Sequence, residues 1–413
     1  MDARSEPSSN FPGSSVEARA RTFLHVFLVS LKLGMTSFGG PIAHLGYFHR
    51  EFVVRRKWLK EHDYADLIAL CHFLPGPTSS QVNMAVGLVH AGWKGALGAW
   101  LGFTLPSFVL MVAFASGVDR FGVLASAGWL KGLKIVAVAV VAQAVWSMGR
   151  KFCPTGPKVA LALLGAGFLL SPFAPPASQL LVMACGAFFG WVLLRGKGPV
   201  IAAPSSLVMP YGAKVGGGLL ILFVVFFLGL PLAAAWSGNG MAATFASFFR
   251  TGSLVFGGGH VVLPLLQSEV VRPGWVGDDR FLAGYGAAQA LPGPLFTFAA
   301  YLGAVMKPGS HGWLGGAWCL IAIFLPSFLL VFGTLPFWGR LREMASAQAA
   351  LQGANIAVVA VLLAALVNPV WTTSVHDVAG VVLAATVLGL LFRGLPPWLV
   401  VLFGAAGGML LWG

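Results

Sequence analysis

Residues 27–40 of the chain read FLVSLKLGMTSFGG, and residues 245–258 read FASFFRTGSLVFGG. Both stretches begin with an aromatic residue, place a cation five positions later and a glycine two positions after the cation, and end in Phe-Gly-Gly. Chance does not repeat so many unusual residues in one order, and a fixed offset is the mark of an internal repeat. The sequence therefore predicts a chain of two related halves.

Further motifs recur in the same order in both halves. The pairs are Leu-Pro-Gly-Pro at 74–77 and 291–294, Gly-Trp-x-Gly at 92–95 and 312–315, and Leu-Pro-Ser-Phe at 105–108 and 325–328. These pairs extend the repeat over most of the chain. We predict a disordered tail over 1–20, a first repeat over 21–196, a linker with an extra transmembrane helix over 197–240, and a second repeat over 241–413.

The composition requires a membrane as solvent. Of the 413 residues, 57% are hydrophobic and 9% are charged, whereas roughly 25% of a soluble domain is charged. Apolar runs of about 18 or more residues recur along the chain, and each can cross the hydrocarbon core as a helix. These runs do not alternate as the strands of a barrel do. We expect an all-α polytopic membrane protein with about 12–13 transmembrane helices.

One apolar run, residues 214–236, has no counterpart in the other half. If each half crosses the membrane an even number of times, this extra span makes the halves an inverted repeat, as in secondary transporters that bind substrate near the midplane. The first apolar stretch covers residues 22–45, and the loop that follows it is strongly basic. The equivalent loop of the second half is nearly neutral, which agrees with the two loops lying on opposite sides of the membrane. Absolute orientation and a possible homodimer are left open.

The charges and cysteines exclude several classes of function. The net charge is +13, but the basic residues form short clusters between apolar runs, which is typical of topology signals rather than a nucleic-acid surface. The four scattered cysteines suggest no metal site. There is no phosphate-binding loop, and no nucleophile and base stand at a catalytic spacing. We expect no enzyme activity, no cofactor and no metal, with the lipid bilayer as a partner.

Lys32 and Arg250 are cations inside apolar stretches, a placement that costs at least about 2.5 kcal/mol. Each lies seven positions before the first glycine of its Phe-Gly-Gly motif, so cation and motif share one helix face. That face could hold an anion. The alternative is that Lys32 extends its amine to the headgroups. Carboxylates are nearly absent from the apolar runs, which argues against a cation carrier.

The glycine and proline motifs predict broken helices. Two glycines weaken a helix by about 1 kcal/mol each, and two prolines remove backbone donors. The helix that restarts after a break offers free N–H groups that favour an anion. Close helix packing and a simple kink are the alternatives. The predicted substrate-binding residues are Lys32, Phe38, Gly39, Gly40, Pro75, Gly76, Pro77, Thr78, Ser79, Gln81, Asn83, Arg250, Phe256, Gly257, Gly258, Pro292, Gly293 and Pro294.

The two proline motifs lead into segments of different polarity. Hydroxyls and amides crowd residues 78–83, whereas Leu295, Phe296, Thr297 and Phe298 come after the second motif and contribute one hydroxyl. We therefore expect a lopsided site. Proton coupling could use a titratable group near the motifs, although a histidine beside a turn is more often structural. The candidates are Glu51, Glu269, His44, His72 and His260.

Taken together, Phe-Gly-Gly-Pro at 38–41, Pro-Gly-Pro at 75–77, Gly-Trp-Lys-Gly at 92–95 and Leu-Pro-Ser-Phe at 105–108 resemble the signature of the chromate ion transporter family in its long, two-domain form. The resemblance implies a bacterial inner-membrane, multi-pass carrier that exports chromate, with sulfate as analogue and competitor, draws on the proton motive force and gives chromate resistance. The alternatives are an uptake carrier for sulfate or another oxyanion, an anion channel, and a membrane enzyme.

Overall fold

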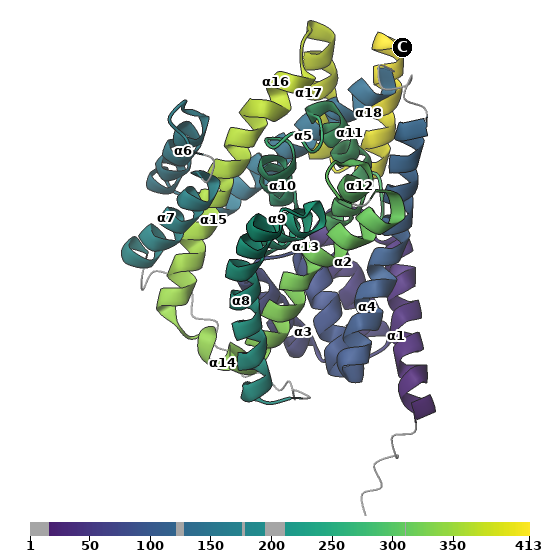
Figure 1. Ribbon diagram of the computed structural model, residues 1–413, viewed down its shortest axis with the longest axis vertical. Helices are drawn as coiled ribbons and strands as arrows, with labels where there is room; N and C mark the ends of the chain where they lie inside the picture. Colours follow the sequence, from purple (N-terminus) through teal and green to yellow (C-terminus); the bar gives the residue numbers. More distant parts are fainter. Residues whose placement is uncertain (1–15, 121–127, 176–177, 195–210, 310) are drawn as a thin grey trace, which may run out of the picture.

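The computed structural model describes residues 16–120, 128–175, 178–194, 211–309 and 311–413, and within them it contains helices and no strand (Figure 1). The predicted all-α class is confirmed. Most of the predicted tail and the start of the predicted linker lie outside the described residues. The first helix already begins at Val16, inside the stretch that the sequence assigns to the tail.

The helices of the first half recur in the same order in the second. The first half contains α1 (Val16–Thr36), α2 (Gly40–Phe48), η1 (His49–Arg55), α3 (Glu61–Phe73), α4 (Thr78–Arg120), α5 (Gly128–Phe152), α6 (Gly156–Leu170) and α7 (Ser178–Leu193). After α8 (Ala213–Ser237), the second contains α9 (Gly240–Leu254), η3 (Gly259–Val261), α10 (Val262–Val270), α11 (Asp278–Ala288), η4 (Leu295–Thr297), α12 (Phe298–Val305), α13 (Gly312–Thr334), η5 (Leu335–Phe337), α14 (Trp338–Leu341), α15 (Ala345–Ala365), η6 (Leu366–Trp371), α16 (Thr372–Ser374), α17 (Val378–Phe392) and α18 (Pro397–Trp412).

Five of the described helices are long and apolar enough to cross a membrane: Thr78–Gly117, Gly128–Phe152, Ala213–Ser237, Gly312–Leu341 and Ala345–Ser374. Six further apolar helices are shorter. Several short helices lie on either side of a break, as α9 and α10 do. Two such helices together cover the length that one transmembrane helix of about 20 residues would cover. The span without a counterpart, α8, packs on α9 and α13 but fully buries only Gly216, so most of its surface is left toward lipid.

The predicted discontinuous helices are confirmed. The first apolar stretch does not form one helix, because α1 ends at Thr36 and α2 restarts at Gly40 with a proline in its first turn. Gly39 has a φ of 98°, and Gly76, in the first proline motif, has a φ of 124°. Gly257 and Gly293 repeat this in the second half, with φ values of 76° and 93°. Residues with a Cβ rarely adopt such values, so these are breaks rather than kinks.

A helical hairpin comes after each proline break. Gly92, with a φ of 63°, reverses the direction of α4, so that the helix folds back on itself. A Cβ on Gly87 would lie 2.4 Å from the carbonyl oxygen of Gly95 in the returning arm. In the second half a Cβ on Gly303 would lie 2.2 Å from the carbonyl oxygen of Gly315. Glycine therefore allows the two backbones of each hairpin to touch.

The last helix of each repeat packs on the other repeat. In Figure 1, α18 lies beside α5 and α7 lies beside α15. A Cβ on Gly132 of α5 would lie 2.1 Å from the carbonyl oxygen of Gly404, and a Cβ on Gly353 of α15 would lie 2.0 Å from that of Gly186. Gly190, one turn beyond Gly186, also contacts Gly353, so this is a small-xxx-small contact. The exchange is reciprocal and interlocks the repeats.

The two repeats run in opposite directions. The returning arm of α4 leads to α5, whose first residue, Gly128, lies against Gly408 and Gly413 at the end of α18, at the top of Figure 1. The equivalent helix, α13, leads instead to α14 at the bottom of the figure. Equivalent helices that point to opposite ends are the arrangement that an inverted repeat requires.

Replacing Gly353 with leucine tests the interlock. We expect Gly353→Leu to lower the stability of the folded protein by about 1–3 kcal/mol or more, because the new side chain would have to separate α15 from α7. The thermal unfolding midpoint of the detergent-solubilised protein, followed by tryptophan fluorescence, measures the effect. Gly229→Leu on α8 is the matched control, because no atom lies within 4 Å of a Cβ there. Equal midpoints for the two variants would refute the predicted contact.

Candidate functional site

The four breaks, one glycine break and one proline break from each repeat, meet between the repeats. The backbone N–H of Gly76 donates to the carbonyl oxygen of Val255 at 2.7 Å, and the backbone N–H of Gly293 donates to that of Ser37 at 3.0 Å. Val255 and Ser37 are equivalent residues, each immediately before a Phe-Gly-Gly motif. We call this meeting point, which consists of residues 37–41, 74–78, 255–259 and 291–295, the central junction.

The two hydrogen bonds of the central junction result from the breaks themselves. Each break leaves backbone N–H and C=O groups without helical partners, and hydrocarbon offers no water to replace them. The proline break of one repeat supplies a donor, and the glycine break of the other supplies an acceptor. Each repeat therefore supplies one backbone hydrogen bond that the other lacks at this point.

A third motif also reaches the central junction. A Cβ on Gly76 would lie 2.6 Å from the hydroxyl oxygen of Ser327, and a Cβ on Gly293 would lie 3.0 Å from that of Ser107. These serines belong to the two Leu-Pro-Ser-Phe motifs, which align the repeats in sequence. Neither serine is among the site residues predicted from the sequence. Their position in a motif repeated in both halves is the signal that could have identified them.

Helix N-termini from both repeats gather at the central junction. Here α2 and α4 begin in the first repeat, and η3 and η4 lead into α10 and α12 in the second. A Cβ on Gly259 would lie 3.8 Å from Pro41 and 3.7 Å from Leu295, so first turns from both repeats are in contact. Free N–H groups and aligned peptide dipoles make such ends favourable for an anion. The arrangement can hold an oxyanion between the two repeats.

The polar residues after the first proline break are buried but not equivalent. The Gln81 amide donates to the carbonyl oxygen of Pro75 at 2.7 Å and reaches Ser327 at 3.4 Å. Among the described residues, the Gln81 amide oxygen and the Ser80 hydroxyl have no hydrogen-bond partner. Asn83, in contrast, donates to Ala99 across the α4 hairpin at 2.9 Å. Gln81 and Ser80 therefore retain capacity for a ligand, and Asn83 holds the hairpin together.

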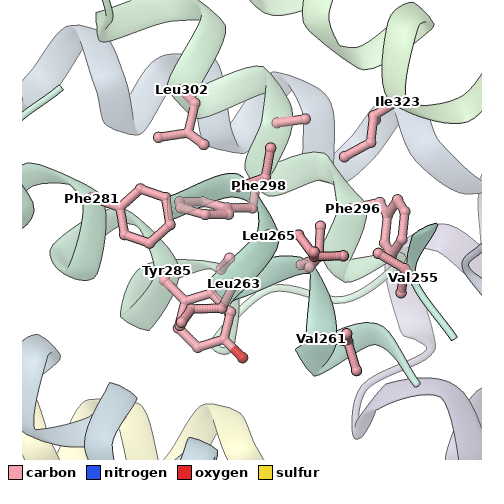
Figure 2. Packing of buried hydrophobic residues seen from close by; sticks show 14 of the residues in the cluster. Val255, Val261, Leu263, Leu265, Phe281, Tyr285, Phe296, Phe298, Leu302 and Ile323 are labelled. Carbon is pink, nitrogen blue, oxygen red and sulfur yellow. The ribbon is translucent and has the colours of Figure 1, made fainter. Parts of the chain in front are cut away.

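The second proline break is packed instead of polar. Figure 2 shows Phe298 beside Phe281 and Tyr285, with ring centroids 5.1 and 5.7 Å apart, and Phe296 in the same apolar core. The single hydroxyl here, on Thr297, donates to the carbonyl oxygen of Pro294 at 2.8 Å. The difference between the two proline breaks that the sequence predicts is therefore present in the structure.

The two aromatic residues of the Phe-Gly-Gly motifs pack against other helices. Phe38 lies near Trp398 at the start of α18, with ring centroids 6.2 Å apart, and Phe256 packs against the hydrophobic core. The first glycine of each motif, Gly39 or Gly257, is exposed, in contrast to the partly buried aromatic residue before it. A ligand at the central junction would meet the glycine backbone before it met these rings.

The three candidate histidines lie in different surroundings. Both ring nitrogens of His44 have partners, the carbonyl oxygen of Ser37 at 3.1 Å and the hydroxyl of Ser79 at 3.2 Å. His260 lies 3.0 Å from the hydroxyl of Tyr285. His72 is exposed near the end of α3. His44 thus contacts the central junction through Ser37, whereas His260 directly follows the junction in the chain and is held by Tyr285.

Lys32 does not lie at the central junction. Its side chain is exposed on the face of α1 that also carries Leu28 and Met35. The opposite face of α1 packs on α4, where a Cβ on Gly34 would lie 2.6 Å from the carbonyl oxygen of Phe103. The close packing at Gly34 fixes the rotation of α1 and turns Lys32 outward, which is the surrounding that the headgroup alternative requires.

Arg250, the counterpart of Lys32, is paired with a carboxylate. Its Nε donates to Glu269 Oε1 at 2.9 Å, and its terminal nitrogen donates to the other oxygen of the same group. The counterpart of Glu269, Glu51, binds Arg56 at 2.6 Å and Arg55 at 3.1 Å instead. Burial raises the pKa of the Glu51 carboxyl, but the hydrogen bonds and charges of the two arginines outweigh burial and bring that pKa below its ordinary value. The two repeats therefore use equivalent glutamates differently.

Comparison with known proteins agrees with this picture. The family model described as "Chromate transporter" matches residues 24–191 and again residues 242–409. The "Probable chromate transport protein" of Synechococcus elongatus is 27% identical over 410 residues, which cover 92% of this chain and 94% of the relative. The "Chromate transport protein" of Cupriavidus metallidurans is 24% identical over 416 residues, with 95% and 94% covered.

A shorter match, over 332 residues at 26% identity, joins 78% of this chain to 74% of the "Chromate transport protein" of Pseudomonas aeruginosa. The comparison with solved structures gave no match. Within the described residues, no group of three His, Cys, Asp or Glu side chains could hold a metal ion. The two matches of the family model show that this chain belongs to the chromate transporter family and carries the family domain twice.

Proposed function

We propose that the protein is a secondary carrier that exports chromate across the bacterial inner membrane, is driven by the proton motive force and thereby gives chromate resistance. Membership of the chromate transporter family supports chromate as the substrate. The observation that carries the mechanism is the reciprocal pair of hydrogen bonds, Gly76 to Val255 and Gly293 to Ser37, which joins broken helices from two inverted repeats. Sites of this kind lie near the midplane in secondary transporters.

The central junction is the proposed substrate site. A divalent oxyanion loses hydration when it enters the bilayer, and it needs several donors in return. The N-termini that meet here offer backbone N–H groups, and the buried side chains of Gln81 and Ser80 add polar groups from the first repeat. Arg250, about two helical turns before the second glycine break, adds a cation that pairs with Glu269 when no anion is bound.

A carrier, rather than a channel or an enzyme, fits the connection between the repeats. Because the hydrogen bonds of the central junction cross from one repeat to the other, a rocking motion of the repeats would expose the site to one side at a time. Proton coupling is proposed at Glu51, Glu269, His44, His72 or His260. Uptake of sulfate or another oxyanion is the alternative, and transport direction separates it from export.

Everted inner-membrane vesicles provide the direct test of export. We expect vesicles that contain the protein to accumulate labelled chromate, with saturable kinetics, when respiration energises them, because an exporter then faces inward. A protonophore is expected to abolish the accumulation, and excess sulfate is expected to compete. Vesicles without the protein give the background. Flux that rises linearly with concentration and ignores the protonophore would identify a channel, and accumulation only in right-side-out vesicles would identify an uptake carrier.

Gly76→Ala tests the central junction. We expect at least a tenfold loss of chromate transport, because the new methyl group meets Ser327 at 2.6 Å and because a φ of 124° is strained for alanine. Initial rates in everted vesicles, normalised to protein content, measure the loss. Gly229→Ala is the control, in a helix where the methyl group meets nothing. Normal transport by Gly76→Ala would remove the glycine break from the mechanism.

Gln81→Glu tests whether an anion approaches this residue. The substitution keeps the shape of the side chain but adds a buried negative charge, so we expect the KM for chromate to rise at least tenfold by like-charge repulsion. Asn239→Asp is the matched amide-to-acid control, because Asn239 caps α9 at the surface and aspartate caps equally well. An unchanged KM for Gln81→Glu in folded protein would place the substrate elsewhere.

A further inference from the structure

A polar cavity lies between α9, α10 and the start of α7. Its volume is about 660 Å³. The charged and hydroxyl groups that line it are Ser247, Arg250, Thr251, Ser268, Glu269 and Arg272. Arg250 precedes the exposed Gly257 by seven residues on the same chain, which at 1.5 Å per residue corresponds to roughly 10 Å if the helical rise continued. The α9 helix, which ends at Leu254 immediately before Val255 of the central junction, connects the two places.

Glu269 binds the side of the Arg250 guanidinium that carries Nε and one terminal nitrogen. Two nitrogens of Arg250 donate to the two carboxylate oxygens, with Nε 2.9 Å from Oε1. The same planar fork recognises any group that presents two oxygens side by side, including tetrahedral oxyanions. The carboxylate thus stands where an oxyanion would bind. Arg250 and Glu269 keep 32% and 19% of their side-chain surface exposed to the cavity and its opening, so an incoming anion can reach the pair.

A buried hydroxyl beside the ion pair also has no partner. Thr251 lines the cavity, is 1% exposed, and its Oγ1 makes no hydrogen bond to any described residue. Ser268, in contrast, donates to Gln179 at 3.2 Å and to the carbonyl oxygen of Leu265 at 2.8 Å. A buried hydroxyl without a partner is uncommon in proteins. The Thr251 hydroxyl is therefore available as a donor to a ligand that fills the cavity.

The pairing of Glu269 with Arg250 is particular to the second repeat. In the first repeat, Glu51 is held by Arg55 and Arg56 instead, and the equivalent cation, Lys32, is exposed on α1. Between Glu269 and Trp275 the second repeat carries one arginine, Arg272, followed by Pro273 and Gly274, where the first repeat carries Arg55, Arg56 and Lys57 before Trp58. The glutamate on α10 is therefore not drawn away, and it bonds the cation on α9 instead.

We propose that the Arg250 cavity is a second binding site for the transported oxyanion, and that Glu269 is a built-in competitor that leaves the guanidinium when the oxyanion binds. This inference rests on the proposed function as a chromate carrier. The competitor keeps Arg250 neutralised while the cavity is empty, which lowers the cost of a cation inside the protein. It also weakens the hold on the oxyanion, so that the anion can move on to the central junction.

Chromate binding to the purified, detergent-solubilised protein tests the competitor. We expect Glu269→Gln to tighten binding of labelled chromate in equilibrium dialysis by about fivefold or more, the range of a modest coupling between two ligands of one site. Arg250→Gln is expected to weaken binding at this site. The double variant Arg250→Gln/Glu269→Gln is expected to match Arg250→Gln, because the gain requires the guanidinium. Glu343→Gln is the matched control, because Glu343 is exposed after α14 and does not line the cavity. Its affinity for chromate is expected to be unchanged.

Two further variants keep the test decisive if Glu269→Gln does not fold. Glu269→Asp retains the charge but shortens the side chain, and an intermediate gain in affinity is expected. Thr251→Val retains the shape and removes the hydroxyl, and weaker binding is expected. Affinity for chromate that is unchanged or lower in Glu269→Gln or Glu269→Asp, with wild-type binding intact, would overturn the competitor. A wild-type protein that neither binds nor transports chromate would instead overturn the proposed function.

Discussion

The whole arrangement depends on one constraint, which is that backbone groups inside a bilayer must find hydrogen-bond partners within the protein. Four breaks in apolar helices create helix ends whose backbone N–H and C=O groups have no hydrogen-bond partner within the same helix. The structure solves this by exchange, because Gly76 of the first repeat donates to Val255 of the second and Gly293 of the second donates to Ser37 of the first. The breaks can exist only because the repeats face each other, and an inverted relation brings each donor to the acceptor that it needs.

The outer helices of the bundle are also held by contacts between the two repeats, but these contacts are close packing and not hydrogen bonds. Apolar helices gain little from one another in lipid, so close backbone contact must hold them together. Gly353 against Gly186, and Gly132 against Gly404, provide that contact between the repeats. The inner hydrogen bonds and the outer glycine contacts both cross the boundary between the repeats, so the two family domains pack together as one structure.

The sequence predicts well those features that are encoded locally. Paired glycines and prolines, repeated at one offset, predict the breaks and their equivalence, and the residues after Pro77 and Pro294 predict that the first break is polar and the second is not. The sequence does not show which break pairs with which, because that depends on tertiary packing. The rotation of α1 is an example: the contact of Gly34 with α4 turns Lys32 outward, although its spacing from the glycine break suggests an inward face. Asn83 is another, since its partner becomes a neighbour only through the reversal of α4.

The packed second proline break has a consequence for how freely the two repeats can rearrange. Rings that interlock, as Phe298 does with Phe281 and Tyr285, have few other arrangements of equal energy, whereas hydroxyls and amides can exchange partners at little cost. The packed break is therefore the more rigid of the two, and the polar break is the one whose hydrogen-bond partners can change. The two repeats share one backbone plan but differ in how easily their proline breaks can rearrange.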